Sequence, residues 1–135
     1  MNKVFNWPVR IYYEDTDAGG VVFYANYLKF YERARTENLR AMGFEQDQLM
    51  ADESVIFVVR SVQLDYLKPA RFNDLLNVTS EFSSVKSASL TFVQTVTRDD
   101  ELLNEAVVRI ACLDAETMRP KLIPVALKQS LENDD

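Results

Sequence analysis

Apolar and polar residues alternate along several stretches of the chain, and alternation with a period of two predicts β-strands. Four such stretches follow one another at residues 62–66, 76–82, 88–96 and 106–112. Short polar corners separate them, which is typical of an antiparallel meander. A fifth alternating stretch near the start, at residues 9–13, predicts one more strand.

Between the first strand and the other four, apolar residues recur every three to four positions and predict a long amphipathic helix over residues 24–42. Gly43 is expected to follow its end in the left-handed conformation. Two polar residues, Arg35 and Asn38, fall on the apolar side of this helix. We expect both to be buried with partners, such as Glu32 for Arg35 at a spacing of three residues.

The order of these elements predicts an α+β fold, with the long helix packed on one face of an antiparallel sheet of about five strands. A second, short helix is expected at residues 45–52. With 135 residues and neither a repeat nor a linker, the chain is expected to form a single domain over residues 1–135.

The composition narrows the chemistry, because the chain has no histidine and one cysteine. These counts exclude Ser-His-Asp triads, Cys-His dyads and histidine-ligated metal sites. Cys112 lies in an apolar stretch and is expected to be a small core residue rather than a nucleophile. Proton transfer must therefore use carboxylates, lysine, tyrosine, water or the backbone.

The charge balance bears on partners and location. With 15 basic and 21 acidic residues, the net charge is −6, which disfavours nucleic acid as a partner. No run approaches the roughly 20 apolar residues of a membrane span. Residues 1–10 lack the apolar core of a signal peptide. We therefore expect a cytoplasmic protein without a membrane span.

Residues 14–20, Glu-Asp-Thr-Asp-Ala-Gly-Gly, lie between the first strand and the long helix and form the main candidate site. A helix start offers unpaired N–H groups and the positive end of the helix dipole. A carboxylate beside it can act as a base or nucleophile, and glycines let the backbone approach a ligand. The same residues also suit a plain loop with a helix N-cap, so their spacing leaves both interpretations open.

The identities of the residues in this region are more informative than their spacing alone. The run YYEDTDAGGVVFYANYL at residues 12–28, followed by FYERARTE at residues 30–37, resembles the acyl-CoA thioesterases of the hotdog fold. The resemblance is closest to the Tol-Pal-associated (YbgC-type) branch of the 4-hydroxybenzoyl-CoA thioesterase family. It covers nearly the whole chain, since FVVR at 57–60, LKPA at 67–70, DLL at 74–76 and MRP at 118–120 also look like that branch.

The resemblance implies a sheet curled around the central helix, and dimers that join sheets edge to edge and commonly pair into tetramers. Active sites would lie at the subunit interface. The implied reaction is hydrolysis of an acyl-CoA, with a short-chain or aromatic acyl group, to a free acid and coenzyme A. No cofactor is implied, because coenzyme A enters only as part of the substrate.

The family motif also assigns roles to residues of this chain. Asp17 matches the catalytic carboxylate, which would either attack the thioester carbon to form a mixed anhydride or activate water. The backbone N–H groups of Phe23 and Tyr24 would hold the thioester oxygen. Three further residues would shape the loop: Asp15, Gly19 and Gly20.

Coenzyme A carries several negative charges, and its phosphates need cations. Lys86 lies between two predicted strands, and Arg119 and Lys121 follow the last one. These three are candidates for contacts with the phosphates, with Arg60 and Arg71 as weaker candidates, and for each of them a solvated surface charge is the favoured alternative.

One departure from the branch concerns Tyr24, which stands where most of its members carry histidine. A backbone N–H would survive this change, whereas a contribution from the imidazole ring would not. Tyr24 would either line the acyl pocket or serve packing alone. The alternative function is a non-catalytic module that binds acyl thioesters or acyl carrier protein. A hotdog dehydratase is disfavoured, because those enzymes rely on histidine.

Overall fold

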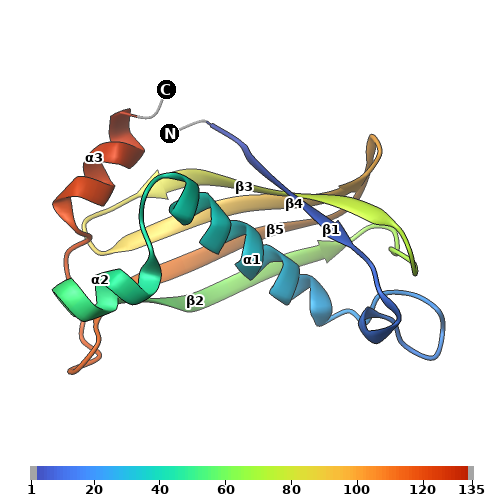
Figure 1. The fold of residues 1–135 in the computed structure, drawn as a ribbon, viewed down its shortest axis with the longest axis horizontal. Helices are drawn as coiled ribbons and strands as arrows, with labels where there is room; N and C mark the ends of the chain where they lie inside the picture. The colour runs from blue at the N-terminus through green and yellow to red at the C-terminus, as the bar shows by residue number, and fades with distance from the viewer. Residues whose placement is uncertain (1–2, 134–135) are drawn as a thin grey trace.

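A five-stranded antiparallel sheet forms the centre of the computed structural model, which describes residues 3–133 (Figure 1). The spatial order of the strands is β1-β3-β4-β5-β2, and every neighbouring pair is antiparallel. Their bounds are β1 (Phe5–Arg10), β2 (Val55–Tyr66), β3 (Leu75–Val85), β4 (Ser89–Arg98) and β5 (Glu101–Asp114). The predicted α+β fold with about five antiparallel strands is confirmed.

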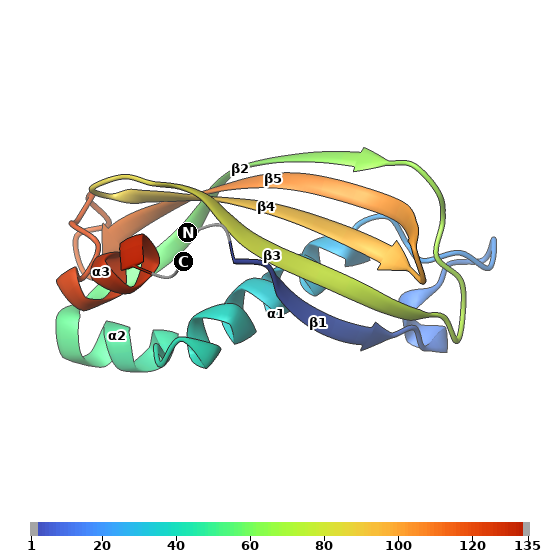
Figure 2. The ribbon, with the colours of Figure 1, turned by 90° about the horizontal axis from the view of Figure 1, so that it is seen from above.

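Three helices accompany the sheet: α1 (Asn26–Ala41), α2 (Gln46–Glu53) and α3 (Val125–Asn133). Figure 2 shows the sheet curving over α1, with α2 continuing on the same side. The predicted long and short helices are thereby confirmed, whereas α3 was not predicted. None of the helices within residues 3–133 is long and apolar enough to cross a membrane.

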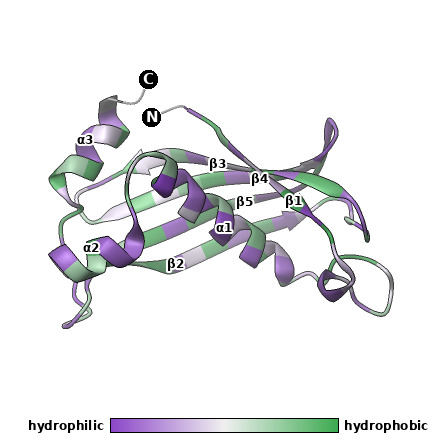
Figure 3. Ribbon diagram, in the orientation of Figure 1, coloured by the Kyte–Doolittle hydropathy of each residue, from purple (hydrophilic) through white to green (hydrophobic). Residues whose placement is uncertain are grey.

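The core lies between α1 and the concave face of the sheet. Phe30, Tyr31 and Ala34 of α1 are buried there against strand residues such as Val78 and Phe92. The hydropathy colours of Figure 3 change along the strands and around α1, as expected for elements with one buried face.

The end of α1 has the geometry predicted for Gly43. Its φ is +95°, its N–H donates to the carbonyl oxygen of Arg40 at 2.9 Å, and the next N–H, of Phe44, reaches the carbonyl of Leu39 at 2.9 Å. These two bonds close a Schellman motif, which satisfies carbonyls that the helix leaves unpaired.

The polar residues on the inner face of α1 are held by the sheet. The Asn38 side chain is buried and donates to the hydroxyl of Ser80 at 3.2 Å. Arg35 donates from Nη1 to Oε1 of Gln94 at 2.9 Å, whereas the expected partner Glu32 acts on the guanidinium through its charge. Gln94 is fully buried on β4, opposite α1, and offers its carbonyl oxygen where Arg35 points inward.

The first strand differs from the prediction in its bounds. It begins at Phe5, includes Pro8 and ends at Arg10, whereas residues 9–13 were expected. A proline is tolerated because β1 is an edge strand, where one row of N–H groups has no ladder partner. Beyond it, residues Tyr13–Asp15 form a single 3₁₀ turn (η1).

Candidate active site

The Asp-Thr-Asp run folds into a tight turn between β1 and α1, which we call the Asp17 turn (residues 15–22). The N–H of Asp17 donates to the carbonyl of Val21 at 2.9 Å, and the N–H of Gly20 donates back to the carbonyl of Asp17 at 3.0 Å. Gly20 has a φ of +81°, a conformation that glycine adopts without the steric cost of a Cβ. The turn therefore leaves the Asp17 side chain exposed at its surface.

The Asp17 carboxylate is exposed, and one of its two oxygens accepts a hydrogen bond. Its Oδ1 accepts the N–H of Gly19 at 2.8 Å. A Cβ added at Gly19 would lie 3.2 Å from the same oxygen, tighter than an ordinary van der Waals contact. Among the described residues, no hydrogen bond involves Oδ2 of Asp17, which leaves that oxygen open to a substrate or a water.

Asp15 joins the turn to the helix through its carbonyl and to η1 through its side chain. The carbonyl accepts the N–H of Phe23 and the side-chain amide of Asn26, both at 2.9 Å. The carboxylate accepts the N–H of Tyr12 at 2.8 Å. Asn26, the buried first residue of α1, was not singled out from the sequence, although an amide at a helix start is a recognisable signal.

These contacts correct one of the two predicted oxyanion donors. Because the N–H of Phe23 is bonded to Asp15, it is not free to stabilise a negative oxygen. The N–H of Tyr24 has no hydrogen-bond partner in the part of the chain that the structure describes. Tyr24 therefore remains as the predicted donor.

A cavity of about 210 Å³ opens beside Tyr24 and lies between the start of α1 and the end of β2. Its lining residues are Val22, Tyr24, Tyr27, Tyr66, Leu67, Lys68 and Pro69. The rings of Tyr24 and Tyr27 meet that of Tyr66 edge-on, with centroids 6.4 and 5.7 Å apart. The Tyr66 hydroxyl donates to the backbone carbonyl of Tyr24 at 3.0 Å. Desolvation raises the pKa of both Tyr27 and Tyr66, so these phenols are neutral at neutral pH.

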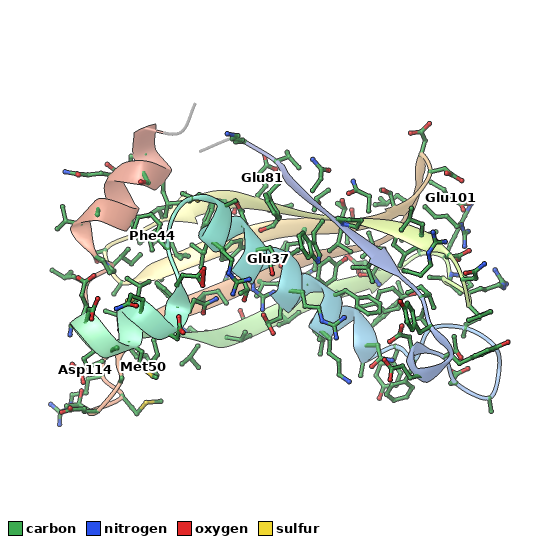
Figure 4. The ribbon with its side chains drawn as sticks, viewed as in Figure 1. Glu37, Phe44, Met50, Glu81, Glu101 and Asp114 are labelled. Carbon is green, nitrogen blue, oxygen red and sulfur yellow. The ribbon has the colours of Figure 1, made fainter. Side chains whose placement is uncertain are left out.

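The three predicted phosphate contacts lie at the opposite end of the sheet. β3 starts beside the Asp17 turn and ends next to Lys86. The strand has ten steps of about 3.3 Å, so its two ends are about 33 Å apart. Lys121 forms an ion pair with Asp114 at 3.5 Å, and Figure 4 shows Asp114 at the end of the molecule away from Glu101. Arg119 lies in the same region, where its carbonyl accepts the Asp114 N–H. Within the chain, the structure does not bring these three cations to Asp17.

The remaining candidate groups are structural. Cys112 is fully buried, and burial raises the pKa of its thiol to about 11, so it is not a thiolate at neutral pH. Within residues 3–133, no group of three or more acidic or cysteine side chains is placed to hold a metal ion.

Comparisons with known proteins cover nearly the whole chain. The family described as the thioesterase-like superfamily matches residues 12–131. An acyl-CoA thioester hydrolase YbgC of Escherichia coli O157:H7 is 50% identical over 125 residues, which are 92% of each chain. The acyl-CoA thioesterase YbgC of Haemophilus influenzae is 45% identical over 133 residues, 98% of each. The crystal structure of a probable thioesterase from Bartonella henselae superimposes on this chain with a TM-score of 0.86 and 32% sequence identity. The match covers 90% of this chain and 100% of the Bartonella henselae chain.

Proposed function

The chain belongs to the thioesterase-like superfamily, and from this we propose that it is an acyl-CoA thioesterase of the hotdog fold with Asp17 as its catalytic carboxylate. The observation that carries the proposal is the Asp17 turn, which presents a carboxylate beside the start of α1. The reaction consumes a thioester and water and releases a carboxylic acid and coenzyme A.

Two roles suit the open oxygen of Asp17. In one, Oδ2 attacks the thioester carbon, the thiolate leaves, and water hydrolyses the resulting mixed anhydride. In the other, the carboxylate removes a proton from a water that attacks the same carbon. Both need a fixed carboxylate, and the bond from the Gly19 N–H restrains Oδ1 while Oδ2 has no hydrogen bond among the described residues.

The oxygen of the thioester gains negative charge as the tetrahedral intermediate forms. We infer that the N–H of Tyr24, which no described residue accepts, and the positive end of the α1 dipole stabilise this charge. This contribution comes from the backbone, so it does not need the histidine ring that most members of the branch carry at this position.

The tyrosine-lined cavity supports a short-chain or aromatic acyl group. An engineered apolar cavity of about 150 Å³ is enough to bind benzene. The cavity of about 210 Å³ beside Tyr24 therefore accommodates one ring or a short branched chain. Its three tyrosine rings offer edges and faces that suit an aromatic guest.

The free edge of β2 supports the proposal that the protein is a homo-oligomer. β2 has 12 residues and lies at one edge of the sheet, where Val59 and Val62 are 46% and 39% exposed. A long exposed edge with apolar side chains is a template for pairing with another strand. If two copies paired antiparallel along β2, opposite ends of the two sheets would lie side by side. The end that carries Arg119 and Lys121 in one copy would then lie beside the Asp17 turn of the other.

The activity is tested by following thiol release from acetyl-, isobutyryl-, benzoyl- and palmitoyl-CoA. We expect turnover of the first three and the highest kcat/KM with a compact acyl group. Absence of turnover on all four, together with tight binding of acyl carrier protein, would support the binding module instead.

A further inference from the structure

Residues 12–20, which we call the acidic segment, carry the proposed catalytic carboxylate between β1 and α1. A loop at residues 69–74 holds the start of this segment. The N–H of Ile11 donates to the carbonyl of Asp74, and the N–H of Asn73 donates back to the carbonyl of Ile11, both at 2.9 Å. This pair of bonds fixes the chain where it enters the acidic segment.

The same loop also holds the end of the acidic segment. The N–H of Val22 donates to the carbonyl of Ala70 at 2.8 Å, and Val21 and Arg71 form an antiparallel β-bridge. The position of the acidic segment therefore depends, at both of its ends, on the shape of one loop.

The side chain of Arg98 joins the two ends of that loop. Its Nη1 donates to the carbonyl of Pro69 at 3.3 Å and to Oδ2 of Asp74 at 2.8 Å. The side chains of Arg98 and Asp74 are only 25% and 22% exposed, so solvent screens their ion pair less than it screens a surface pair. One guanidinium thus sets the separation between the first and last residues of the loop.

The guanidinium is itself fixed to the sheet. Arg98 and Glu101 flank the turn between β4 and β5, and Nη2 of Arg98 donates to Oε1 of Glu101 at 2.6 Å. The other oxygen of Glu101 pairs with Nζ of Lys68 at 2.7 Å, just before the loop. Figure 1 shows the β4–β5 turn, the chain after β2 and the chain before α1 at the same end of the sheet. All of these bonds lie within one copy of the chain, so they do not depend on pairing along β2.

The conformation of the loop requires such support. Asn73 has a φ of +71°, in the left-handed region that residues other than glycine adopt at a cost in free energy. Oδ2 of Asp74, which receives Arg98, also accepts the N–H of Arg71 at 2.8 Å. Removing the guanidinium would leave this carboxylate without its counter-charge at the point where the loop returns to the sheet.

We propose that Arg98 is a positioning residue for Asp17, which acts by holding together the two ends of the loop that fixes the acidic segment. The proposal rests on the proposed thioesterase function. The described residues that line the cavity beside Tyr24 do not include Arg98. Its effect therefore falls on the placement of the carboxylate and not on the binding of the acyl group.

The kinetic test uses Arg98→Gln and Arg98→Lys with the best of the four acyl-CoA substrates. Because a small misplacement of a catalytic group is costly, we expect kcat of Arg98→Gln to fall about tenfold. KM should stay within about twofold of the wild type. Lysine keeps the charge but not the forked donors, so Arg98→Lys should recover part of the loss, to about threefold below the wild-type kcat.

A double variant tests whether Arg98 acts through the loop. Asp74→Asn removes the charge that Arg98 contacts at the end of the loop, and it should lower kcat as well. Two independent losses would multiply to about 100-fold, whereas a shared contact predicts about tenfold in Arg98→Gln/Asp74→Asn.

Arg40→Gln is the matched control. Arg40 also donates to two carboxylates, at 2.6 Å to Glu37 and at 2.8 Å to Glu45, but it lies at the last turn of α1. Its loss removes a comparable pair of ionic contacts away from the acidic segment, so kcat and KM should equal those of the wild type.

Amide hydrogen exchange tests the same contacts without turnover. In Arg98→Gln, the N–H groups of Val22 and Asn73 should exchange about tenfold faster, because the carbonyls they contact belong to the loop and to the strand it holds. The N–H of Phe44, bonded to Leu39 at the far end of α1, should exchange at the wild-type rate.

Four results would overturn the proposal: a wild-type kcat in a folded Arg98→Gln or Arg98→Lys protein, an equal fall of kcat in Arg40→Gln, a rise of KM with kcat unchanged, and faster exchange at Phe44 to the same extent as at Val22. The last would mean general destabilisation. If the wild type hydrolyses none of the four thioesters, the proposed function fails, while the exchange rates of Val22 and Asn73 still decide whether Arg98 fixes the loop.

Discussion

The N–H of Gly19 and the Oδ1 of Asp17 form a hydrogen bond of 2.8 Å that spans only two residues. A Cβ at residue 19 would come within 3.2 Å of the same oxygen, closer than an ordinary van der Waals contact. In Gly19→Ala the carboxylate must move by a few tenths of an ångström. We expect kcat to fall about tenfold with little change in the free energy of unfolding. Steady-state kinetics combined with urea denaturation checks this, and a wild-type kcat in the variant would mean that the bond does not aim Asp17.

Two glycines with positive φ allow an effect on kcat to be distinguished from an effect on the free energy of unfolding. Gly20 has φ +81° and Gly43 has φ +95°, and no atom lies within 4 Å of a Cβ added at either. Alanine at each position should lower the free energy of unfolding by about 1–2 kcal/mol, from backbone strain alone. Only Gly20→Ala should also reduce kcat, because Gly20 lies in the Asp17 turn. Equal kinetic losses in both variants would show that general destabilisation explains the effect.

The hydroxyl of Tyr66 positions the start of α1 through the carbonyl of Tyr24. Tyr66→Phe keeps the ring in the cavity and removes this single bond. Since one hydrogen bond contributes about 1 kcal/mol, kcat should fall about fivefold while KM stays within twofold. Tyr12→Phe is the control, because the Tyr12 side chain is exposed and has no described hydrogen bond. A rise of KM without a change in kcat would instead assign Tyr66 to acyl binding.

Cys112 should behave as a core residue. Its thiol has a pKa of about 11 because it is desolvated, and its side chain is fully buried. We expect a thiol reagent at pH 8 to modify it only as fast as the protein unfolds. Cys112→Ala should keep kcat and lose about 1 kcal/mol of stability. Rapid labelling of the folded protein, or loss of kcat in the alanine variant, would contradict this.

Asp114 links stability to pH at the other end of the sheet. The N–H groups of Thr117 and Glu116 donate to its carboxylate and, together with Lys121, hold its pKa below the ordinary value. A lowered folded-state pKa stabilises the protein above the unfolded pKa of about 4, and this contribution disappears as the pH falls through the folded value. Asp114→Asn should therefore be less stable than the wild type at pH 7 by urea denaturation, and the difference should shrink at pH 3. A difference that does not change with pH would refute the linkage.

Local periodicity was sufficient to predict the central helix and the strands β3, β4 and β5, because each buries one face along a continuous stretch. For β2 it predicted only residues 62–66, and the strand begins at Val55. It missed α3, whose buried positions are few: Leu127 and Leu131 lie one turn apart after Pro124. It also misplaced the first strand, since Pro8 was interpreted as a boundary although an edge strand tolerates it.

The parts of the site that the sequence could not predict depend on contacts between distant segments. Phe23 was expected to offer a free N–H, but the carbonyl of Asp15 occupies it. Arg35 was expected to pair within its helix, but Gln94 reaches it from β4. Arg71 ranked behind Lys86 as a phosphate contact, and only the β-bridge to Val21 shows that it lies beside the Asp17 turn. The pairings of Arg35 with Gln94 and of Val21 with Arg71 join residues 59 and 50 positions apart and leave no local pattern. Phe23 and Asp15 are eight positions apart, and it is the fold of the loop that joins them.

The central claim is that the Asp17 carboxylate carries the hydrolysis. The most direct measurement is kcat/KM of Asp17→Asn on the best acyl-CoA substrate, with the exposed Asp100→Asn as the matched control. Asparagine keeps an oxygen for the Gly19 N–H and removes both the charge and the nucleophile. We predict a fall of at least about 100-fold in Asp17→Asn and a wild-type value in Asp100→Asn. A folded Asp17→Asn protein with wild-type kcat/KM would contradict the account.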